Sequence, residues 1–147
     1  MELHNAMTPS RAQISELLAS ADPGPVVMVN LLRFRERAVY ADGRETSLSG
    51  LEAFMIYSGL MKTIVEGFGG RFLVSALLDR LVIGSGEMGW HRIGLVEYPS
   101  RAVFAQVATS PAVHEAAVHR SAGLEGQLLI ASTLQADHRD SASGGTR

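Results

Sequence analysis

Residues 26–32 constrain the fold most, because this run is apolar on both of the faces that a strand would present. The run is short and rich in β-branched side chains, which predicts a buried strand. Successive side chains of a strand point to opposite faces of its sheet. The alternation therefore produces two apolar sets, Val26, Met28 and Leu32 on one face and Val27, Val29 and Leu31 on the other. Both faces of a sheet that contains this strand need a cover.

Turn residues and apolar spacing divide the rest of the chain into further elements. Helices are predicted to begin near Ser10, Ser49, Ser100 and Ser110, the last ending at about His119, and Ser49 with Glu52 has the spacing of a capping box. Strands are predicted over residues 71–83, 89–98 and 123–133. After the N-terminal helix, the order βαββαβ predicts a ferredoxin-like α+β fold with an antiparallel sheet. The expected parts are an N-terminal helical extension (1–24), the ferredoxin-like domain (25–134) and a disordered tail (135–147).

A ferredoxin-like sheet carries its helices on one face, so the second apolar face of residues 26–32 needs another cover. A second copy of the chain is the simplest source of a facing sheet. We therefore predict a homodimer whose sheets face each other. Residues 33–48 are polar and long for a connection, which makes them a candidate functional loop.

Composition and spacing exclude several classes of protein. The chain has no cysteine, which excludes a disulfide scaffold, a thiolate nucleophile and a Cys-ligated metal site. Its 13 basic and 15 acidic side chains nearly balance, which argues against a nucleic-acid partner. Without a signal peptide or a run of ~18 apolar residues, we expect a cytoplasmic protein and no membrane partner. The spacing of His114 and His119 does not place both on one helix face, so no metal is expected. No cofactor is expected either.

Six residues are candidates for binding a ligand: Asn30, Arg33, Tyr57, Trp90, Glu97 and Tyr98. An Asn within an apolar strand and an Arg at its end need polar partners, which a ligand with a carbonyl or carboxylate group would supply. We expect Asn30 and Arg33 to face a partly enclosed cavity that Tyr57 and either Trp90 or Tyr98 also line. The loop that leaves the same strand end would cover this cavity.

Four of these residues also have a purely structural interpretation. Asn30 could satisfy a neighbouring loop, and Tyr57 could pack in the core with its hydroxyl hydrogen-bonded. Arg33 could pair with an acid such as Glu97. Glu97 itself is either a general base or the ion-pair partner of Arg33 or Arg92. The roles of His91, His114 and His119 stay open.

Several short stretches are similar, in the same order, to those of one known family. They are Val29-Asn30-Leu31-Leu32-Arg33-Phe34 with Ala38 and Tyr40, Gly50 and Ala53-Phe54 with Tyr57, Gly69-Gly70, Leu95-Val96-Glu97-Tyr98-Pro99-Ser100-Arg101, and Ser110-Pro111. Together they resemble the DUF1330 family of the dimeric α+β barrel superfamily, over residues 25–133. The resemblance implies a ferredoxin-like protomer that pairs sheet to sheet, with a cavity between its sheet and helices or at the dimer seam.

The resemblance implies a fold and leaves the activity open. The superfamily includes cofactor-free monooxygenases, haem-degrading enzymes and lactone isomerases. Our hypothesis is that the chain binds a small organic molecule, aromatic or bearing a carbonyl or carboxylate, in a cleft. The alternatives are a cofactor-free monooxygenase or isomerase and, second, a haem-binding or haem-degrading protein.

Overall fold

The fold is an antiparallel sheet backed by helices, in a computed structural model that describes residues 3–139. The elements in chain order are α1 (Arg11–Leu18), β1 (Val26–Phe34), α2 (Gly50–Gly67), β2 (Arg71–Leu77), β3 (Arg92–Tyr98), α3 (Arg101–Ala108), α4 (Pro111–Gly123) and β4 (Leu124–Ser132). The strands lie in the order β2-β3-β1-β4, and each neighbouring pair is antiparallel. This is the ferredoxin-like βαββαβ arrangement after an extra N-terminal helix, so the predicted fold is confirmed.

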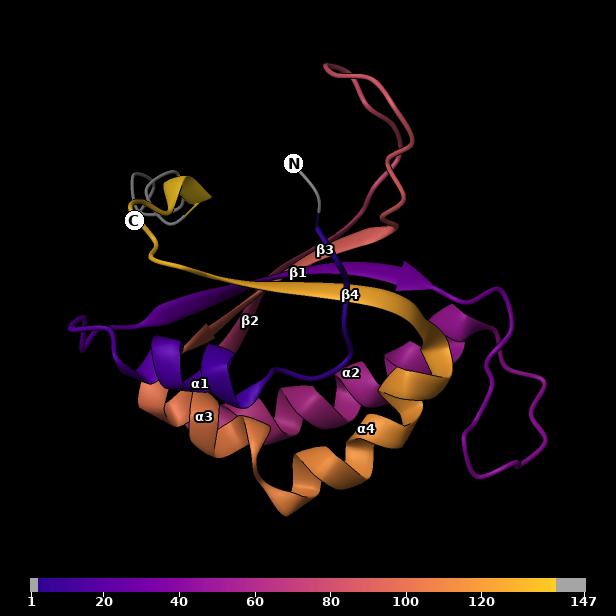
Figure 1. Ribbon diagram of the computed structural model, residues 1–147, viewed down its shortest axis with the longest axis horizontal. Helices are drawn as coiled ribbons and strands as arrows, with labels where there is room; N and C mark the ends of the chain where they lie inside the picture. Colours follow the sequence, from indigo (N-terminus) through magenta and orange to yellow (C-terminus); the bar gives the residue numbers. More distant parts are fainter. Residues whose placement is uncertain (1–2, 140–147) are drawn as a thin grey trace.

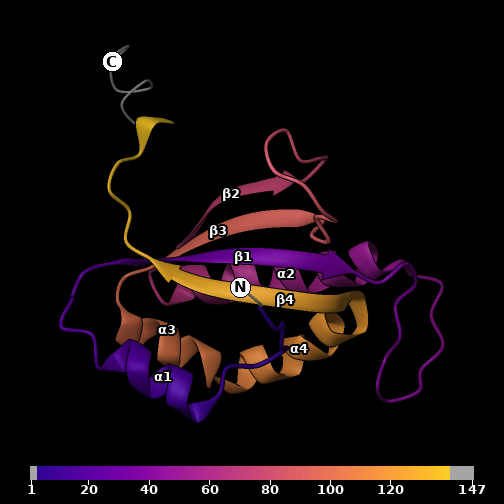
Figure 2. The same cartoon turned by 45° about the horizontal axis from the view of Figure 1, so that its top comes forward.

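The helices α1 to α4 all lie on one side of the sheet (Figure 1). Figure 2 shows β1 in the middle of the sheet, between β3 and β4. None of the four helices covers the opposite side, which we call the open face. Within residues 3–139, no helix combines the length and the apolar character needed to span a membrane.

The hydrophobic core lies between the sheet and the helices, and β1 contributes to it through alternate residues. Val26 and Met28 pack with Met61 and Val65 of α2 in the larger cluster of the core. A second cluster at the other end of β1 consists of Leu32, Phe34, Phe54 and Leu124. The even-numbered residues of β1 therefore face the helices, as the predicted alternation requires.

The odd-numbered residues of β1 face the other way and form the centre of the open face. The strand register places Val29 beside Leu95 of β3 and Ile130 of β4. It places Leu31 beside Ile93 and Leu128 in the same manner. These six aliphatic side chains are only partly buried or exposed in the described part of the chain, so this region of the open face is an apolar surface that none of α1 to α4 covers.

The helix starts follow the sequence signals. The Ser49 hydroxyl accepts a hydrogen bond from the Glu52 backbone N–H at 3.0 Å, and the Glu52 carboxylate accepts one from the Ser49 N–H at 2.8 Å. The predicted capping box is therefore formed at the start of α2. Ser100 and Ser110 cap α3 and α4 by accepting from the N–H of the third residue beyond.

Three predicted boundaries are wrong. β2 ends at Leu77 rather than at residue 83, and β3 begins at Arg92 rather than at residue 89. The intervening residues 78–91 leave the sheet and turn at glycines with positive φ, among them Gly84 and Gly86. In addition, α4 continues to Gly123 instead of ending near His119. Its last turn is fixed by a close contact with α2, which the local sequence does not reveal.

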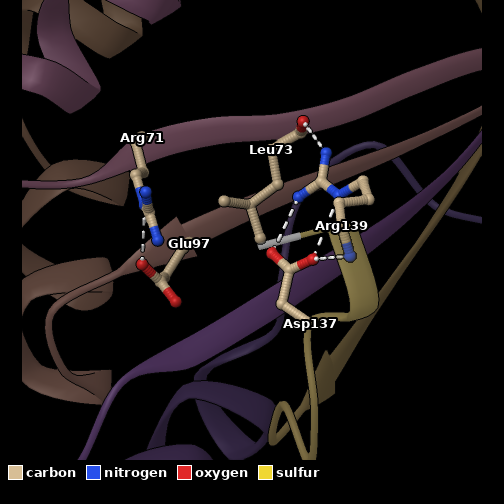
Figure 3. A network of polar contacts seen from close by, with 5 residues as sticks. All are labelled: Arg71, Leu73, Glu97, Asp137 and Arg139. Carbon is tan, nitrogen blue, oxygen red and sulfur yellow. Dashed lines mark hydrogen bonds and ion pairs between the residues drawn. The ribbon is translucent and has the colours of Figure 1, made fainter. Parts of the chain in front are cut away.

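The segment after β4 crosses to the opposite edge of the sheet. Arg139 Nη1 donates to the Leu73 carbonyl of β2 at 2.9 Å, and Arg139 Nη2 lies 3.0 Å from Asp137 Oδ2 (Figure 3). Residues 133–139 therefore lead from β4 to β2, on the side of the open face (Figure 1). Of the tail predicted to be disordered, residues 140–147 lie outside the described residues.

The contact between α2 and α4 requires glycine at its closest point. A Cβ added to Gly123 would meet the Gly50 carbonyl oxygen and would lie 2.8 Å from the Phe54 backbone nitrogen. Both obstacles are backbone atoms of α2, which cannot move aside as a flexible side chain would. The two helices therefore approach each other only because residue 123 lacks a side chain.

We expect Gly123→Ala to lower the free energy of unfolding by about 1–3 kcal/mol, because it overpacks this contact. Gly59→Ala is the matched control, since Gly59 also lies in a helix and an added Cβ there meets nothing within 4 Å. This control should raise stability by up to ~1 kcal/mol through the better helix propensity of Ala. Urea unfolding of both variants measures the difference. Equal stability of the two variants would contradict the assigned contact.

Candidate ligand cavity

A cavity of about 1110 Å³ lies between the helix-facing side of the sheet and the helix layer. Its walls are mostly apolar, with Met28 and Val96 from the sheet and Met61 and Phe104 from the helices. Its volume is slightly above the range of about 300–1,000 Å³ that is typical of small-molecule pockets, so it has room for a small organic molecule. The polar groups on these walls therefore decide which molecule it can take.

The loop between β1 and α2 forms part of the cavity wall. Tyr40, Ala41 and Asp42 of this loop line the cavity. The loop is held against α4, because the Tyr40 hydroxyl and His119 Nδ1 form a hydrogen bond at 2.7 Å and the Val39 N–H donates to the Ala122 carbonyl at 3.0 Å. This placement agrees with the expectation that the loop leaving β1 covers a cavity.

Two amide side chains meet on the sheet wall. Gln127 Nε2 of β4 donates to Asn30 Oδ1 of β1 at 3.1 Å. The Asn30 amide nitrogen lies 3.4 Å from the carbonyl oxygens of Met28 and Gly94. Both residues line the cavity. Asn30 therefore has protein partners, which lie in the strands of the sheet and not in a neighbouring loop, and it also presents a polar group to the cavity.

Two tyrosines stand on facing walls of the cavity, Tyr57 on α2 and Tyr98 on β3. Burial raises the pKa of Tyr57, and the Arg120 guanidinium beside it opposes the shift. Burial also raises the pKa of Tyr98 well above its usual range, and the neighbouring Tyr57 adds to the shift. Both phenols therefore stay protonated at neutral pH, and each can donate a hydrogen bond to an acceptor in the cavity.

Two arginines project into the cavity from opposite layers, Arg92 from β3 and Arg120 from α4. The Nε atom of each is buried and has no hydrogen-bond partner. Neither residue belongs to any ion pair among residues 3–139. The guanidinium carbon of Arg120 lies 5.5 Å from the centroid of the Tyr57 ring, and Arg92 Nη1 lies 3.1 Å from the weakly accepting Met55 sulfur. The cavity thus contains two guanidinium groups without a carboxylate partner.

The charge of the cavity is positive. Asp42 is the one carboxylate among its described lining residues, and it is engaged by Arg44, whose Nη2 lies 2.6 Å from Asp42 Oδ2. This ion pair leaves the charges of Arg92 and Arg120 unbalanced. The arrangement therefore attracts an anion or an electron-rich carbonyl.

Three of the six predicted site residues line the cavity and three do not. Asn30, Tyr57 and Tyr98 line it together. Arg33 lies on the open face instead, where Nη1 donates to the Gly89 carbonyl at 2.7 Å and Nε lies 3.5 Å from a Glu125 carboxylate oxygen. The expectation that Arg33 shares a cavity with Asn30 is therefore wrong, because an odd spacing along β1 places the two side chains on opposite faces.

Glu97 and Trp90 also lie outside the cavity. Glu97 is on the open face and pairs with Arg71, with 3.1 Å between Arg71 Nε and Glu97 Oε1 (Figure 3). An ion pair is therefore its role in the structure, with Arg71 as the partner instead of Arg33 or Arg92. Trp90 lies just before β3, in the segment that leaves the sheet.

Arg92 and Arg120 do not stand out in the sequence as site residues, although a weak signal for each exists. Arg92 lies an even number of residues from Val96 and Tyr98 in β3, so alternation places all three side chains on one face of the strand. Arg92 is then a charged residue on an apolar face. Arg120 follows Val113 and Ala116 at helical spacing in α4, with the same implication. Only the packing of α4 on the sheet brings the two arginines to one cavity.

His91, His114 and His119 lie in three different surroundings. The His119 ring is hydrogen-bonded to the Tyr40 hydroxyl, and His114 lines the cavity. His91 Nδ1 accepts a hydrogen bond from the Phe34 backbone N–H at 2.9 Å. Among residues 3–139, His and acidic side chains form no group of three or more that could hold a metal ion.

Comparisons with known proteins agree with this architecture. The methylated RPA0582 protein shares 31% sequence identity with the chain at a TM-score of 0.80, covering 91% of this chain and 98% of that chain. A structure of RPA0582, a protein of unknown function from Rhodopseudomonas palustris, shares 28% identity at a TM-score of 0.79, covering 91% and 100%. SnoaB, a cofactor-independent oxygenase from Streptomyces nogalater, is similar in fold alone, with 11% identity and a TM-score of 0.50 over 78% of this chain and 96% of that chain.

No curated protein matches the chain. One family model matches, described as a domain of unknown function (DUF1330), over residues 44–134. The matched segment spans α2 to β4 and therefore includes Tyr57, Arg92 and Arg120. Since this match extends over more than half of the sequence, the chain belongs to the DUF1330 family.

Proposed function

We propose that the protein binds a small aromatic molecule bearing a carboxylate or an acidic carbonyl group in the cavity between its sheet and its helices. The observation that carries this proposal is the pair of arginines on the cavity walls, Arg92 and Arg120, whose Nε atoms are buried without a hydrogen-bond partner and which pair with no carboxylate among residues 3–139. The same cavity offers apolar and aromatic surface to the rest of the ligand. The proposal keeps Asn30, Tyr57 and Tyr98 as site residues and adds Arg92, Arg120 and Gln127.

The energetic argument starts from the cost of burying these groups. A buried polar atom without a hydrogen bond costs about 1–3 kcal/mol, and a charged one costs more. A carboxylate would offset this cost, because a guanidinium donates two parallel hydrogen bonds to its two oxygens, and an enolate oxygen would accept one such charge-assisted hydrogen bond. The protonated Tyr57 phenol lies next to Arg120 and would donate a further hydrogen bond to the same group.

The aromatic part of the ligand follows from the side chains around these donors. Phe54 and Tyr57 line the cavity with a centroid distance of 5.6 Å, and Phe104 lines it beside Tyr98. Rings at such distances offer both faces and edges to a further ring. The similarity to SnoaB extends to fold alone, so we propose binding and do not extend the proposal to oxygenase chemistry.

We expect Arg92→Gln and Arg120→Gln each to weaken binding of anilinonaphthalene sulfonate, an aromatic anion, by about tenfold, which corresponds to ~1.4 kcal/mol. Binding of the neutral analogue phenylnaphthylamine should change less than about twofold, because only the charged contact is lost. Fluorescence titration measures both affinities.

Arg101→Gln is the matched control. Arg101 Nε is also buried and without a partner, yet Arg101 does not line the cavity. Its substitution should leave both affinities unchanged. If Arg101→Gln and Arg120→Gln reduce the binding of the anion equally, or if neither does, the cavity is not the anion site.

We further propose that the protein is a homodimer whose copies meet through their open faces. Val29, Leu31, Ile93, Leu95, Leu128 and Ile130 form one continuous aliphatic surface by strand register. A two-fold dimer would bury the same surface on both copies, which is the simplest way to remove it from water. The apolar character of both faces of β1 supports this assembly.

We expect Ile130→Glu to raise the dissociation constant of the dimer at least about a hundredfold, because two unpaired carboxylates would be buried in the seam. Ile56→Glu is the matched control, since Ile56 lies on α2 and is 41% exposed, against 46% for Ile130. Light scattering at micromolar concentration should report a monomer for the first variant and a dimer for the second. A wild-type monomer would contradict the proposed assembly.

A further inference from the structure

The segment between β2 and β3, residues 78–91, forms a projecting arm. It rises from the sheet on the side of the open face, away from all four helices (Figure 1). Its base is held firmly, because the Leu78 N–H donates to the His91 carbonyl at 2.9 Å and the His91 N–H donates to the Leu32 carbonyl at 2.8 Å. Arg33 Nη1 adds a hydrogen bond to the Gly89 carbonyl at 2.7 Å. The direction of the arm is therefore set by the sheet.

The tip of the arm is apolar and exposed. Leu81, Val82 and Ile83 are 43%, 90% and 92% exposed, and the last two are the most exposed large hydrophobic residues described. Gly84 and Gly86 follow with positive φ and turn the chain back. Single exposed apolar residues are common, but three in a row at the end of a projection are typical of a binding surface.

We propose that the tip of this arm packs against the second copy of the chain, so that each protomer of the homodimer clasps the other. The proposal rests on the homodimer proposed above. The arm and the apolar open face lie on the same side of the sheet, so a copy that covers the open face stands beside the arm (Figure 1).

The reach of the arm fits this role. Two sheets that pack face to face lie about 10 Å apart. The arm has about seven residues in each leg, which span roughly 20 Å when extended at ~3.3 Å per residue. The tip would therefore pass the midplane of the seam and contact the body of the partner. The two-fold symmetry of the dimer would repeat the contact with the second arm.

The charges of the arm favour a protein partner over a membrane. Asp79 and Arg80 form an ion pair with each other, with 3.4 Å between Arg80 Nε and Asp79 Oδ1, and Glu87 adds a negative charge. A segment that inserts into an anionic lipid surface would instead carry an excess of Lys and Arg beside its apolar residues. The cavity of the same protomer lies on the far side of the sheet, so the tip does not serve it.

The absence of cysteine from the chain makes a direct test possible. Val82→Cys introduces a single thiol at the tip, which is coupled to a maleimide benzophenone and irradiated. We expect a cross-linked species of dimer mass, and in a mixture of unlabelled and nitrogen-15-labelled protein we expect cross-linked peptides that join a labelled and an unlabelled copy. Glu45→Cys, on the exposed loop between β1 and α2, is the control and should remain monomeric on denaturing gels.

A second variant measures the energetic effect of the tip. The double substitution Val82→Ser with Ile83→Ser should raise the dissociation constant of the dimer at least about tenfold without lowering the melting temperature of the protomer. A wild-type dimer that shows neither the cross-link nor this weakening would overturn the clasp and leave the homodimer intact. A wild-type monomer in light scattering would remove both proposals. Sedimentation of the wild type, but not of the double variant, with phosphatidylserine vesicles would assign the tip to a membrane and overturn the clasp.

Discussion

The rest of the structure depends on the burial of β1 in the middle of the sheet. This strand has neighbours on both sides and apolar residues on both faces, so it can be satisfied only between two layers. Its even-numbered side chains pack with residues of α2, α3 and β3 in one hydrophobic core. Its odd-numbered side chains form the open face, which the helices do not cover. The protomer therefore presents one side that the helices cover and one apolar side that they leave uncovered.

The cavity follows from how the helix layer is supported. One hydrophobic cluster holds the two layers together at each end of β1, and the cavity lies along the same strand. The close contact of Gly50 and Gly123 fixes α4 against α2 and so sets the position of Arg120. Arg120 forms no ion pair with a carboxylate among residues 3–139, whereas Arg33 on the open face pairs with Glu125. The difference between the two faces explains why Arg33 has a carboxylate partner and Arg120 has none among the described residues.

The elements that could be predicted from the sequence are those whose signals are local. The capping box of Ser49 and Glu52 involves residues three apart, and the βαββαβ order follows from periodicity and turns. The end of β2 could not be predicted, because residues 78–83 carry the apolar composition of a strand and yet have no neighbouring strand to pair with. The extension of α4 to Gly123 likewise depends on a contact with α2, far away in sequence.

For the candidate site, the sequence by itself determined the face on which each strand residue lies, because side chains alternate along a strand regardless of their surroundings. Asn30 and Met28 are even-numbered and lie on one face of β1, whereas Arg33 is odd-numbered and lies on the other face. The residue types of Asn30 and Arg33 nevertheless suggest a common site. Only the tertiary structure decided which groups meet across the layers, since Arg120 reaches the cavity through the packing of α4 on the sheet and Arg92 through its place in β3. Contacts between side chains of the helix layer and of the sheet depend on interhelical distances, which are set by residues far apart in the sequence. No local pattern in the sequence encodes these distances.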